Sequence, residues 1–229
     1  MTQRASGKPI VAIDGPVGAG KSTVARGVAQ RLRFRYVDTG AMYRSVAWAV
    51  LQRGVSLSDE RAVTALARSV RIDFVTDPLG QRVLVDGVDV TEAIRTPQVS
   101  DGASIVSVYP GVREAMVTIQ RRMGVDGGVV MEGRDIGTVV FPDAEIKVFL
   151  DASLDERARR RFEELKARGA GVDLESVRKA EEERDRRDRT RNHSPLRAAP
   201  DAVVIDSTGV PADEVVARIV QLVQRRMRE

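Results

Sequence analysis

The stretch PIVAIDGPVGAGKST, residues 9–23, joins an apolar run directly to a glycine-rich turn. The run at 9–14 is short and contains β-branched residues, so it predicts a buried strand. A helical pattern then runs from Lys21 to about Arg33. A strand, a glycine-rich turn and a helix in immediate succession are typical of α/β proteins in which the turn binds phosphate groups. The stretch therefore predicts an α/β fold built around this unit.

The turn itself fits the pattern G-x-x-x-x-G-K-[ST], and the flanking strand and helix make the match specific. Glycines let backbone N–H groups point inward, and the helix N-terminus adds partial positive charge. We expect Lys21 to reach the β- and γ-phosphates of ATP and the hydroxyl of Ser22 to bind Mg²⁺. A glycine-rich turn with an incidental lysine is the alternative, which this context disfavours. The expected ATP-binding residues are Gly15, Pro16, Val17, Gly18, Ala19, Gly20, Lys21, Ser22 and Thr23.

Composition places the chain among globular proteins. Its 229 residues are 42% apolar and 31% charged, which suits one core domain with insertions or two small domains. There is no cysteine, which rules out a cysteine metal site and fits a reducing compartment. The first eight residues are polar and no apolar run approaches membrane-spanning length, so we expect a cytoplasmic protein without a membrane partner.

The order of predicted elements defines the fold class. Apolar strands alternate with helices, which predicts a parallel sheet covered on both faces. Short alternating segments between 71 and 92, joined by DPLG and DG turns, predict a small inserted antiparallel sheet. The predicted strands of the main sheet are 9–14, 35–38, 128–135, 145–151 and 202–206. The predicted helices are 21–33, 40–54, 59–69, 97–107, 111–123, 153–168, 173–191 and 211–227.

Polar residues follow two of these strands, in DTGAMYR (38–44) and EGRD (132–135). Ligands in such sheets bind at the carboxyl ends of the strands, so these residues can face the same cleft as the phosphate loop. A helix cap with a buried tyrosine, and a surface ion pair, are the simpler alternatives for the two stretches. The candidate residues are Thr39, Tyr43, Arg44, Arg134 and Asp135.

A third candidate is the charged run EERDRRDRTRNH, residues 182–193. On a helix, Arg184, Asp188 and Arg191 share one face, where two guanidinium groups and a carboxylate suit a phosphorylated sugar. The surrounding segment 157–191 holds thirteen basic and nine acidic residues, an excess equal to the net charge of +4 of the whole chain. A solvated helix face and a nucleic-acid contact are the alternatives. Interleaved acidic residues and the lack of aromatics in 163–193 disfavour nucleic acid.

Seven stretches, in order along nearly the whole chain, together resemble the bacterial cytidylate kinases: GPVGAGKST, DTGAMYR, PGVREA, GRDIGTVVFPDA, IKVFLDAS, ERDRRDR and DST. The resemblance implies a P-loop kinase with a five-stranded parallel sheet flanked by helices, a small antiparallel-sheet insert and a helical lid. Its expected parts are a core of 1–66 and 105–229, a monophosphate-binding insert of 67–104 and a lid of 155–187. It also implies a monomer that transfers the γ-phosphate of ATP to CMP or dCMP with Mg²⁺.

The resemblance further assigns roles to individual residues. It maps cytosine contacts onto Ser104, Arg113 and Asp135. It maps phosphate contacts onto Arg44, Arg134 and Arg191, with Tyr43 beside them, and sugar contacts onto Arg184 and Asp188. Thr39 stands where some members have serine and keeps the hydroxyl.

The acceptor phosphate is already anionic at neutral pH, so catalysis needs positioning and charge neutralisation rather than a general base. The lid is expected to close over ATP and exclude water, with Arg159, Arg160 and Arg168 as competing candidates for the lid contact. The expected catalytic residues are Lys21, Arg134, Arg191, Arg157 and Arg161.

Two other functions stay open. Another small P-loop kinase, for nucleosides, shikimate or a coenzyme precursor, would share the phosphate loop but not the set of acceptor residues above. A nucleic-acid-binding P-loop protein would use the arginine-rich segment as its footprint. A common GTPase is disfavoured because the chain has no N-K-x-D motif.

Overall fold

The computed structural model describes residues 7–77, 80–167 and 169–228. The chain forms two compact units. The first comprises Met1–Val37 and Gly124–Glu229, and the second comprises Asp38–Met123. Each unit is described in turn below.

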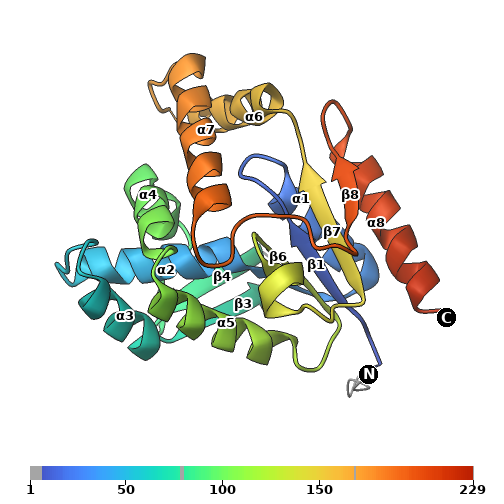
Figure 1. Ribbon diagram of the computed structural model, residues 1–229, viewed down its shortest axis with the longest axis horizontal. Coiled ribbons are helices and arrows are strands. Elements are labelled where there is room, and N and C mark those ends of the chain that lie inside the picture. Colours follow the sequence, from blue (N-terminus) through green and yellow to red (C-terminus); the bar gives the residue numbers. More distant parts are fainter. Residues whose placement is uncertain (1–6, 78–79, 168, 229) are drawn as a thin grey trace. The chain divides into compact units, whose positions relative to one another are not determined.

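A five-stranded sheet forms the centre of the first unit (Figure 1). Its strand order is β2 (Arg35–Asp38), β6 (Val129–Gly133), β1 (Ile10–Asp14), β7 (Ile146–Asp151) and β8 (Val203–Asp206). Strand β1 pairs in parallel with both β6 and β7, and β7 pairs in parallel with β8. The structure thus confirms the predicted five-stranded parallel sheet. Because β1 lies in the middle, its carboxyl end delivers the phosphate loop to the centre of the sheet edge.

Helices α1 (Lys21–Leu32) and α8 (Ala212–Arg226) pack on this sheet in one apolar cluster. Val24 and Val28 of α1 meet Val216 and Ile219 of α8 in that cluster, and all four are buried. Apolar residues recur about once per helical turn in both helices. They therefore lie on one face of each helix, and that face is buried.

The predicted lid consists of α6 (Leu154–Ala167) and α7 (Leu174–Thr190) (Figure 1). The two helices are joined by ion pairs rather than by a wide apolar seam. Arg157 pairs with Asp185 at 2.6 Å, and Arg178 pairs with Asp155 at 2.9 Å. Most of their remaining charged residues are exposed, as the high charge of the segment predicted.

The second unit contains the predicted antiparallel sheet, in which β4 (Gly80–Val85) pairs with both β3 (Ile72–Asp77) and β5 (Val88–Asp89). Its other elements are α2 (Thr39–Gln52), α3 (Glu60–Ser69), η1 (Ala93–Arg95), α4 (Pro97–Val106) and α5 (Pro110–Gly124).

This unit is wider than the insert expected at 67–104. Met42 of α2, Leu66 of α3 and Met116 of α5 share one apolar cluster with the small sheet, so these helices belong to the same compact body. The functional boundaries 67–104 and 155–187 stay predictions.

Candidate active site

The phosphate loop follows β1 and closes on the N-terminus of α1. A Cβ atom at Gly15 would lie 1.9 Å from the main-chain oxygen of Leu150, and one at Gly18 would lie 2.9 Å from Cβ of Arg157. Gly18 also has a φ of 74°, which favours glycine. The loop therefore passes so close to β7 and α6 that side chains are excluded at these two positions.

Lys21 is buried beneath this loop. Its Nζ donates to the main-chain oxygen of Pro16 at 2.5 Å, and the residue is 6% exposed. Burial and, after it, the nearby cation of Arg134 lower the pKa of Lys21 to about 7, against the opposite effect of Glu132 and Asp188. The ammonium group is thus buried next to the guanidinium of Arg134, with carboxylates nearby, and a bound anion would further favour its charged form.

The residues present fit Mg²⁺ bound mainly by nucleotide phosphates. Ser22 is the second residue of α1, directly after Lys21, as the pattern requires for a hydroxyl ligand. Among the described residues there is no group of three or more His, Cys, Asp or Glu that could hold a metal ion. Mg²⁺ in phosphoryl-transfer sites takes few protein ligands and keeps water and phosphate oxygens. The role of Ser22 stays a prediction.

Three of the predicted acceptor residues, all arginines, surround the carboxylate of a fourth, Asp188 of α7. Nε of Arg134 donates to Oδ2 of Asp188 at 2.9 Å, and Nη1 of Arg191 lies 4.0 Å from Oδ1. Arg191 is held in place because its Nε donates to the main-chain oxygen of Ser194 at 2.6 Å. Burial raises the pKa of Asp188, but the charges of Arg134, Arg184 and Arg191 outweigh burial and hold the pKa below its usual range. The charged face predicted on 184–191 is therefore real, and Asp188 organises its arginines.

Asp135 follows β6 and is also buried. The strand ends at Gly133, earlier than the predicted 135, and the chain enters a short π-helical turn, η2 (Ile136–Val140). Main-chain N–H groups of Ile136 and Gly137 donate to the two carboxylate oxygens of Asp14 at 2.8 Å each. The sequence analysis missed both this turn and Asp14; the available signal was a charged residue at the end of an apolar strand.

The lid arginines have different environments. Arg157 donates from Nη1 to the main-chain oxygen of Val17 at 3.2 Å and from Nη2 to Asp185 at 2.6 Å, so it joins the phosphate loop to both lid helices. Arg161 pairs with Glu164 of its own helix at 2.8 Å. Its predicted contact with the transferring group is untested. Arg168, one of the three competing candidates, lies outside the described residues.

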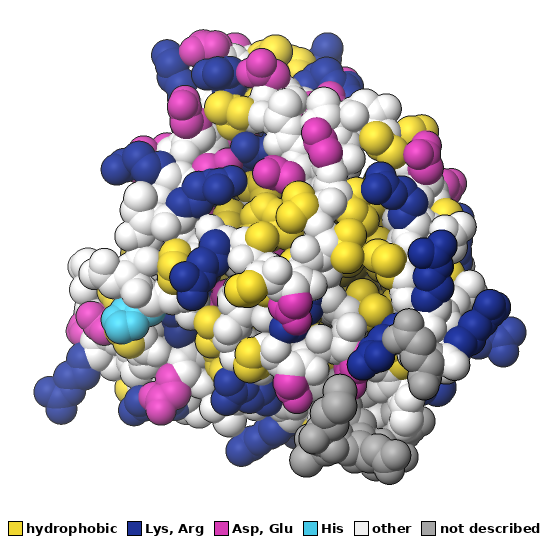
Figure 2. Space-filling model, turned by 45° about the vertical axis from the view of Figure 1, so that its right-hand side comes forward, with side chains coloured by type: hydrophobic (Ala, Val, Ile, Leu, Met, Phe, Trp, Pro, Cys, Tyr) yellow, Lys and Arg dark blue, Asp and Glu magenta, His cyan; other side chains and the backbone are white. Residues whose placement is uncertain are grey.

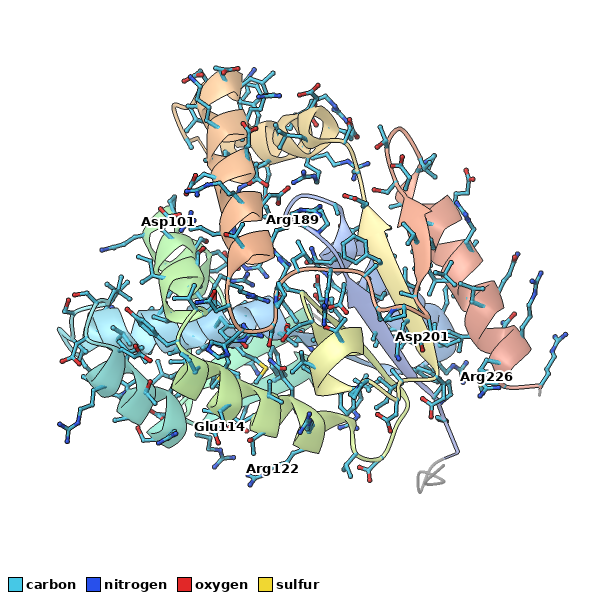
Figure 3. The ribbon with its side chains drawn as sticks, in the orientation of Figure 1. Asp101, Glu114, Arg122, Arg189, Asp201 and Arg226 are labelled. Carbon is cyan, nitrogen blue, oxygen red and sulfur yellow. The ribbon has the colours of Figure 1, made fainter. Side chains whose placement is uncertain are left out.

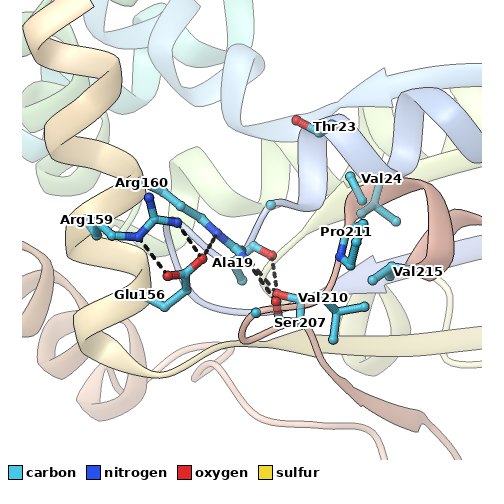
Figure 4. A pocket seen from close by; sticks show the side chains of 13 residues that line it. Ala19, Thr23, Val24, Glu156, Arg159, Arg160, Ser207, Val210, Pro211 and Val215 are labelled. Atoms are coloured by element: carbon cyan, nitrogen blue, oxygen red, sulfur yellow. Dashed lines mark hydrogen bonds and ion pairs between the residues drawn. The ribbon is translucent and has the colours of Figure 1, made fainter.

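Arg160 contacts Ser207, which lies in the stretch DST (206–208) and had no predicted role. Its Nη2 donates to the main-chain oxygen of Ser207 at 2.7 Å, and its Nη1 lies 3.2 Å from Oγ of that residue. The same Oγ donates to the main-chain oxygen of Ala19 at 3.1 Å. Ser207 thus connects the lid helix to the phosphate loop, as Figure 4 shows.

A cavity of about 420 Å³ opens beside these contacts (Figure 4). One side is apolar, and the other carries Glu156, Arg159 and Arg160. Because the cavity borders the phosphate loop at Ala19, Gly20 and Thr23, it has the place and character of a pocket for the base of a nucleotide bound by that loop. Its apolar lining residues include Val24, Val210, Pro211 and Val215.

In the second unit, predicted residues form two small groups. Asp38 caps α2 by accepting from N–H of Ala41 at 2.9 Å and pairs with Arg44 at 2.8 Å. Burial raises the pKa of Asp38, but Arg44 and the cap hydrogen bond outweigh burial and lower it. The alternative reading of DTGAMYR as a helix cap is therefore correct for Asp38, and it fixes Arg44 at the same time. Thr39 is the buried first residue of α2.

The other group is Tyr43, Arg113 and Ser104. The guanidinium carbon of Arg113 lies 5.6 Å from the ring centre of Tyr43, a cation–π distance. Nη1 of Arg113 donates to the main-chain oxygen of Ser107 at 3.1 Å. Oγ of Ser104 is buried and has no hydrogen-bond partner among the described residues, which is the condition of a hydroxyl that a ligand satisfies.

The other three arginines of the charged run within α7 differ in exposure, and Arg187 is half-buried with a buried Nε. Arg186 and Arg189 of α7 are exposed, and Arg186 pairs with Glu183 at 2.8 Å. Arg189 is labelled in Figure 3. On the face shown in Figure 2, basic side chains are interspersed with acidic ones and do not form one continuous patch. This distribution does not favour a nucleic-acid footprint on that face. None of the described helices has the length and apolar character to span a membrane.

A phosphate loop at the centre of a five-stranded parallel sheet, with an arginine-rich helical lid beside it, defines a P-loop kinase. The sequence pattern of the cytidylate kinase family matches residues 11–225, nearly the whole chain. The chain therefore belongs to the cytidylate kinase family.

Known relatives agree with this membership. The cytidylate kinase of Geobacillus kaustophilus is 52% identical over 217 residues, which cover 95% of this chain and 97% of that protein. A bifunctional pantoate ligase/cytidylate kinase of a Synechococcus species is 51% identical over 94% of this chain, which spans only 40% of that relative. An uncharacterized protein from Eubacterium ventriosum shares the fold at a TM-score of 0.53, with 12% identity over 95% of this chain and 99% of that one.

Proposed function

We propose that the chain transfers the γ-phosphate of ATP to CMP and dCMP, giving ADP with CDP or dCDP. A phosphate oxygen of the acceptor forms the new bond to the γ-phosphorus, and the bond from that phosphorus to the bridging oxygen of ADP breaks. The nucleophile is already ionised, so no general base is required. Family membership and the geometry of the first unit support this proposal.

The proposal depends most on the two neighbouring cations Lys21 and Arg134. Arg134, assigned to the acceptor phosphate, is close enough to Lys21, assigned to the donor phosphates, to lower the pKa of that lysine. Two such cations destabilise each other until phosphate groups lie between them. Preorganised positive charge of this kind stabilises a transition state that spreads negative charge over the transferring oxygens. Bound Mg²⁺ would supply further neutralisation, with Ser22 as the protein ligand.

The remaining residues are assigned to binding. Asp188 holds Arg134 and Arg191, which keeps two guanidinium forks ready for the acceptor phosphate. Asp135 is proposed to accept from the exocyclic amine of cytosine; uracil offers a carbonyl there and would face it acceptor to acceptor. The second unit is proposed to supply the other acceptor contacts: Thr39, Tyr43, Arg44, Ser104 and Arg113. A monomer in the cytoplasm remains our prediction from the sequence.

A coupled assay of ADP release tests the proposal. It would use ATP, Mg²⁺ and a panel of CMP, dCMP, UMP, AMP, GMP and shikimate, with Lys21→Ala as the inactive control. We expect rates with CMP and dCMP to exceed the others by at least about tenfold. A preference for shikimate would instead support another small-molecule kinase. Salt-sensitive RNA binding, with no acceptor-dependent ADP release, would support the nucleic-acid reading.

A further inference from the structure

Asp14, the last residue of β1, is a buried carboxylate to which the proposed transfer gives no role. The residue is 5% exposed. Its Oδ1 accepts from the N–H of Ile136 and its Oδ2 from the N–H of Gly137, both at 2.8 Å. Each oxygen of the carboxylate thus binds a main-chain donor from the turn that begins directly after Asp135.

Burying this carboxylate is unfavourable. Burial, with the like charge of Asp135, raises its pKa from 3.8 to about 6, against the opposite effect of the two N–H groups and Lys21. A buried carboxylate with a neighbour of like charge is retained where its hydrogen bonds fix a conformation, which is the best supported use of such groups. The conformation fixed here is that of residues 135–140.

The backbone of Asp135 is held from two sides. Its carbonyl oxygen accepts from N–H of Val139 at 2.9 Å and from N–H of Val140 at 3.2 Å. The next two N–H groups along the chain bind Asp14. With its carbonyl and the following peptide both fixed, Asp135 has little freedom in φ and ψ, and its side chain leaves the backbone in one defined direction.

We infer that Asp14 is a positioning residue that orients Asp135 and thereby sets the preference for cytosine over uracil. This inference rests on the proposed function, in which Asp135 contacts the cytosine amine. Asp14 itself does not touch the acceptor in this account. Its removal therefore lowers discrimination between bases more than it lowers the use of ATP.

The test compares three variants: Asp14→Asn, Asp135→Asn and Asp206→Asn. Asp206 is the matched control, because it ends β8 as Asp14 ends β1 and accepts a main-chain hydrogen bond from Thr208 at 2.8 Å, yet it does not bond to the turn. Each variant is assayed for kcat/KM with CMP and with UMP, for the KM of ATP and for its thermal unfolding. We expect Asp14→Asn to fold, to keep the KM of ATP within about threefold, and to lower the CMP/UMP ratio about tenfold. We expect the ratio of Asp206→Asn to equal that of the unaltered chain.

The outcomes separate the inference from the proposed function. If Asp135→Asn loses discrimination and Asp14→Asn keeps it, the inference is overturned and the proposed role of Asp135 stands. If neither variant changes the ratio, the role of Asp135 is overturned, and with it the inference. A loss of kcat/KM that is equal for CMP and UMP would also overturn it, because a purely structural effect would act on both.

If Asp14→Asn does not fold, a measurement on the unaltered chain tests the inference instead. The amide resonances of Ile136 and Gly137 should titrate together near pH 6, and the CMP/UMP ratio should fall as the pH drops through the same range. Titration of the acceptor phosphate or of Lys21 affects the rates with CMP and UMP equally, so its effect cancels in their ratio. Lys147, whose aliphatic stem lies beside Gly137, is paired with Asp201 at 2.8 Å. The amide of Thr208 is the control, because its partner Asp206 has a lowered pKa. Amides of Ile136 and Gly137 that titrate while the CMP/UMP ratio stays constant through the same pH range would overturn the inference.

Discussion

Arg134 and Asp188 form a 2.9 Å charge-assisted hydrogen bond in the first unit, although 54 residues separate them in the chain. Arg134 follows β6 and Asp188 lies on α7, so the bond connects the sheet edge to the lid helix. Both side chains are largely buried, at 20% and 10% exposure. A buried pair of this kind fixes the guanidinium that is assigned to the acceptor phosphate.

Replacing Asp188 should therefore impair use of the acceptor more than use of the donor. In Asp188→Ala, Arg134 and Arg191 lose their shared carboxylate, and we expect kcat/KM for CMP to fall about 10–100-fold. The KM of ATP should change less than about threefold. Steady-state kinetics with each substrate varied in turn measures both. Arg186→Ala, on the exposed face of α7, is the control and should leave both values unchanged. Equal losses for donor and acceptor would contradict the assignment.

The pKa of Lys21, lowered to about 7, predicts that ATP binding depends on pH. The lysine is protonated below pH 7 and loses its charge as the pH rises, so affinity for ATP should weaken about tenfold between about pH 7 and 8.5. ATP binding measured by calorimetry over this range gives the slope. Lys21→Arg should show a nearly flat profile, because arginine keeps its charge throughout. A flat profile in the unaltered chain would show that Lys21 is fully charged there.

Much of the fold follows from local sequence patterns. Strands, helices and the small antiparallel sheet occur near their predicted residues because apolar periodicity and turn chemistry act over a few residues. The phosphate loop was equally predictable, because its glycine pattern can be recognised in the sequence. In the structure, close contact with β7 and α6 requires glycine at Gly15 and Gly18. Helical spacing correctly placed Arg191 near Asp188, although α7 ends at Thr190 and Arg191 has an extended backbone.

Other features depend on contacts that local patterns do not encode. Asp14 meets the N–H groups of Ile136 and Gly137 across more than 120 residues, and main-chain donors carry no residue signature. Arg157, Arg160 and Arg161 are one residue type on one helix, so only the rotation of α6 decides which of them contacts Val17 or Ser207. The width of the second unit depends on an apolar cluster that joins α2 to a distant sheet.

Ser207 should influence use of the donor specifically. Its hydroxyl bridges Ala19 of the phosphate loop and Arg160 of α6, beside the cavity assigned to the donor base. In Ser207→Ala we expect the KM of ATP to rise about 2–10-fold, the cost of one or two lost hydrogen bonds, with little change in the KM of CMP. Thr208→Ala is the neighbouring control, because its hydroxyl accepts from N–H of Ser153 and does not reach the loop. A rise in the KM of ATP that is equal in both variants would assign the effect to the segment rather than to Ser207.

Asp14 should make the unfolding free energy depend on pH in an identifiable way. Burial raises its pKa from 3.8 to about 6, so its contribution to stability is fully present below about pH 4 and is lost as the pH rises through about 6. The full change corresponds to about 3 kcal/mol. Urea unfolding of the unaltered chain and of Asp14→Asn should therefore show a difference in stability that shrinks by about 2 kcal/mol between about pH 4.5 and 7.5. A difference that is constant with pH would mean that Asp14 has an ordinary pKa.

Transfer of labelled phosphate tests the central claim most directly. The chain would be incubated with Mg²⁺, CMP and ATP labelled in its γ-phosphate, and the labelled products would be separated. The account predicts that the label appears in the β-phosphate of CDP in an amount equal to the ADP formed, and that UMP gives far less labelled UDP. Two results would contradict the account. The label could appear in inorganic phosphate instead of CDP, or protein that binds ATP could consume no labelled ATP in response to CMP.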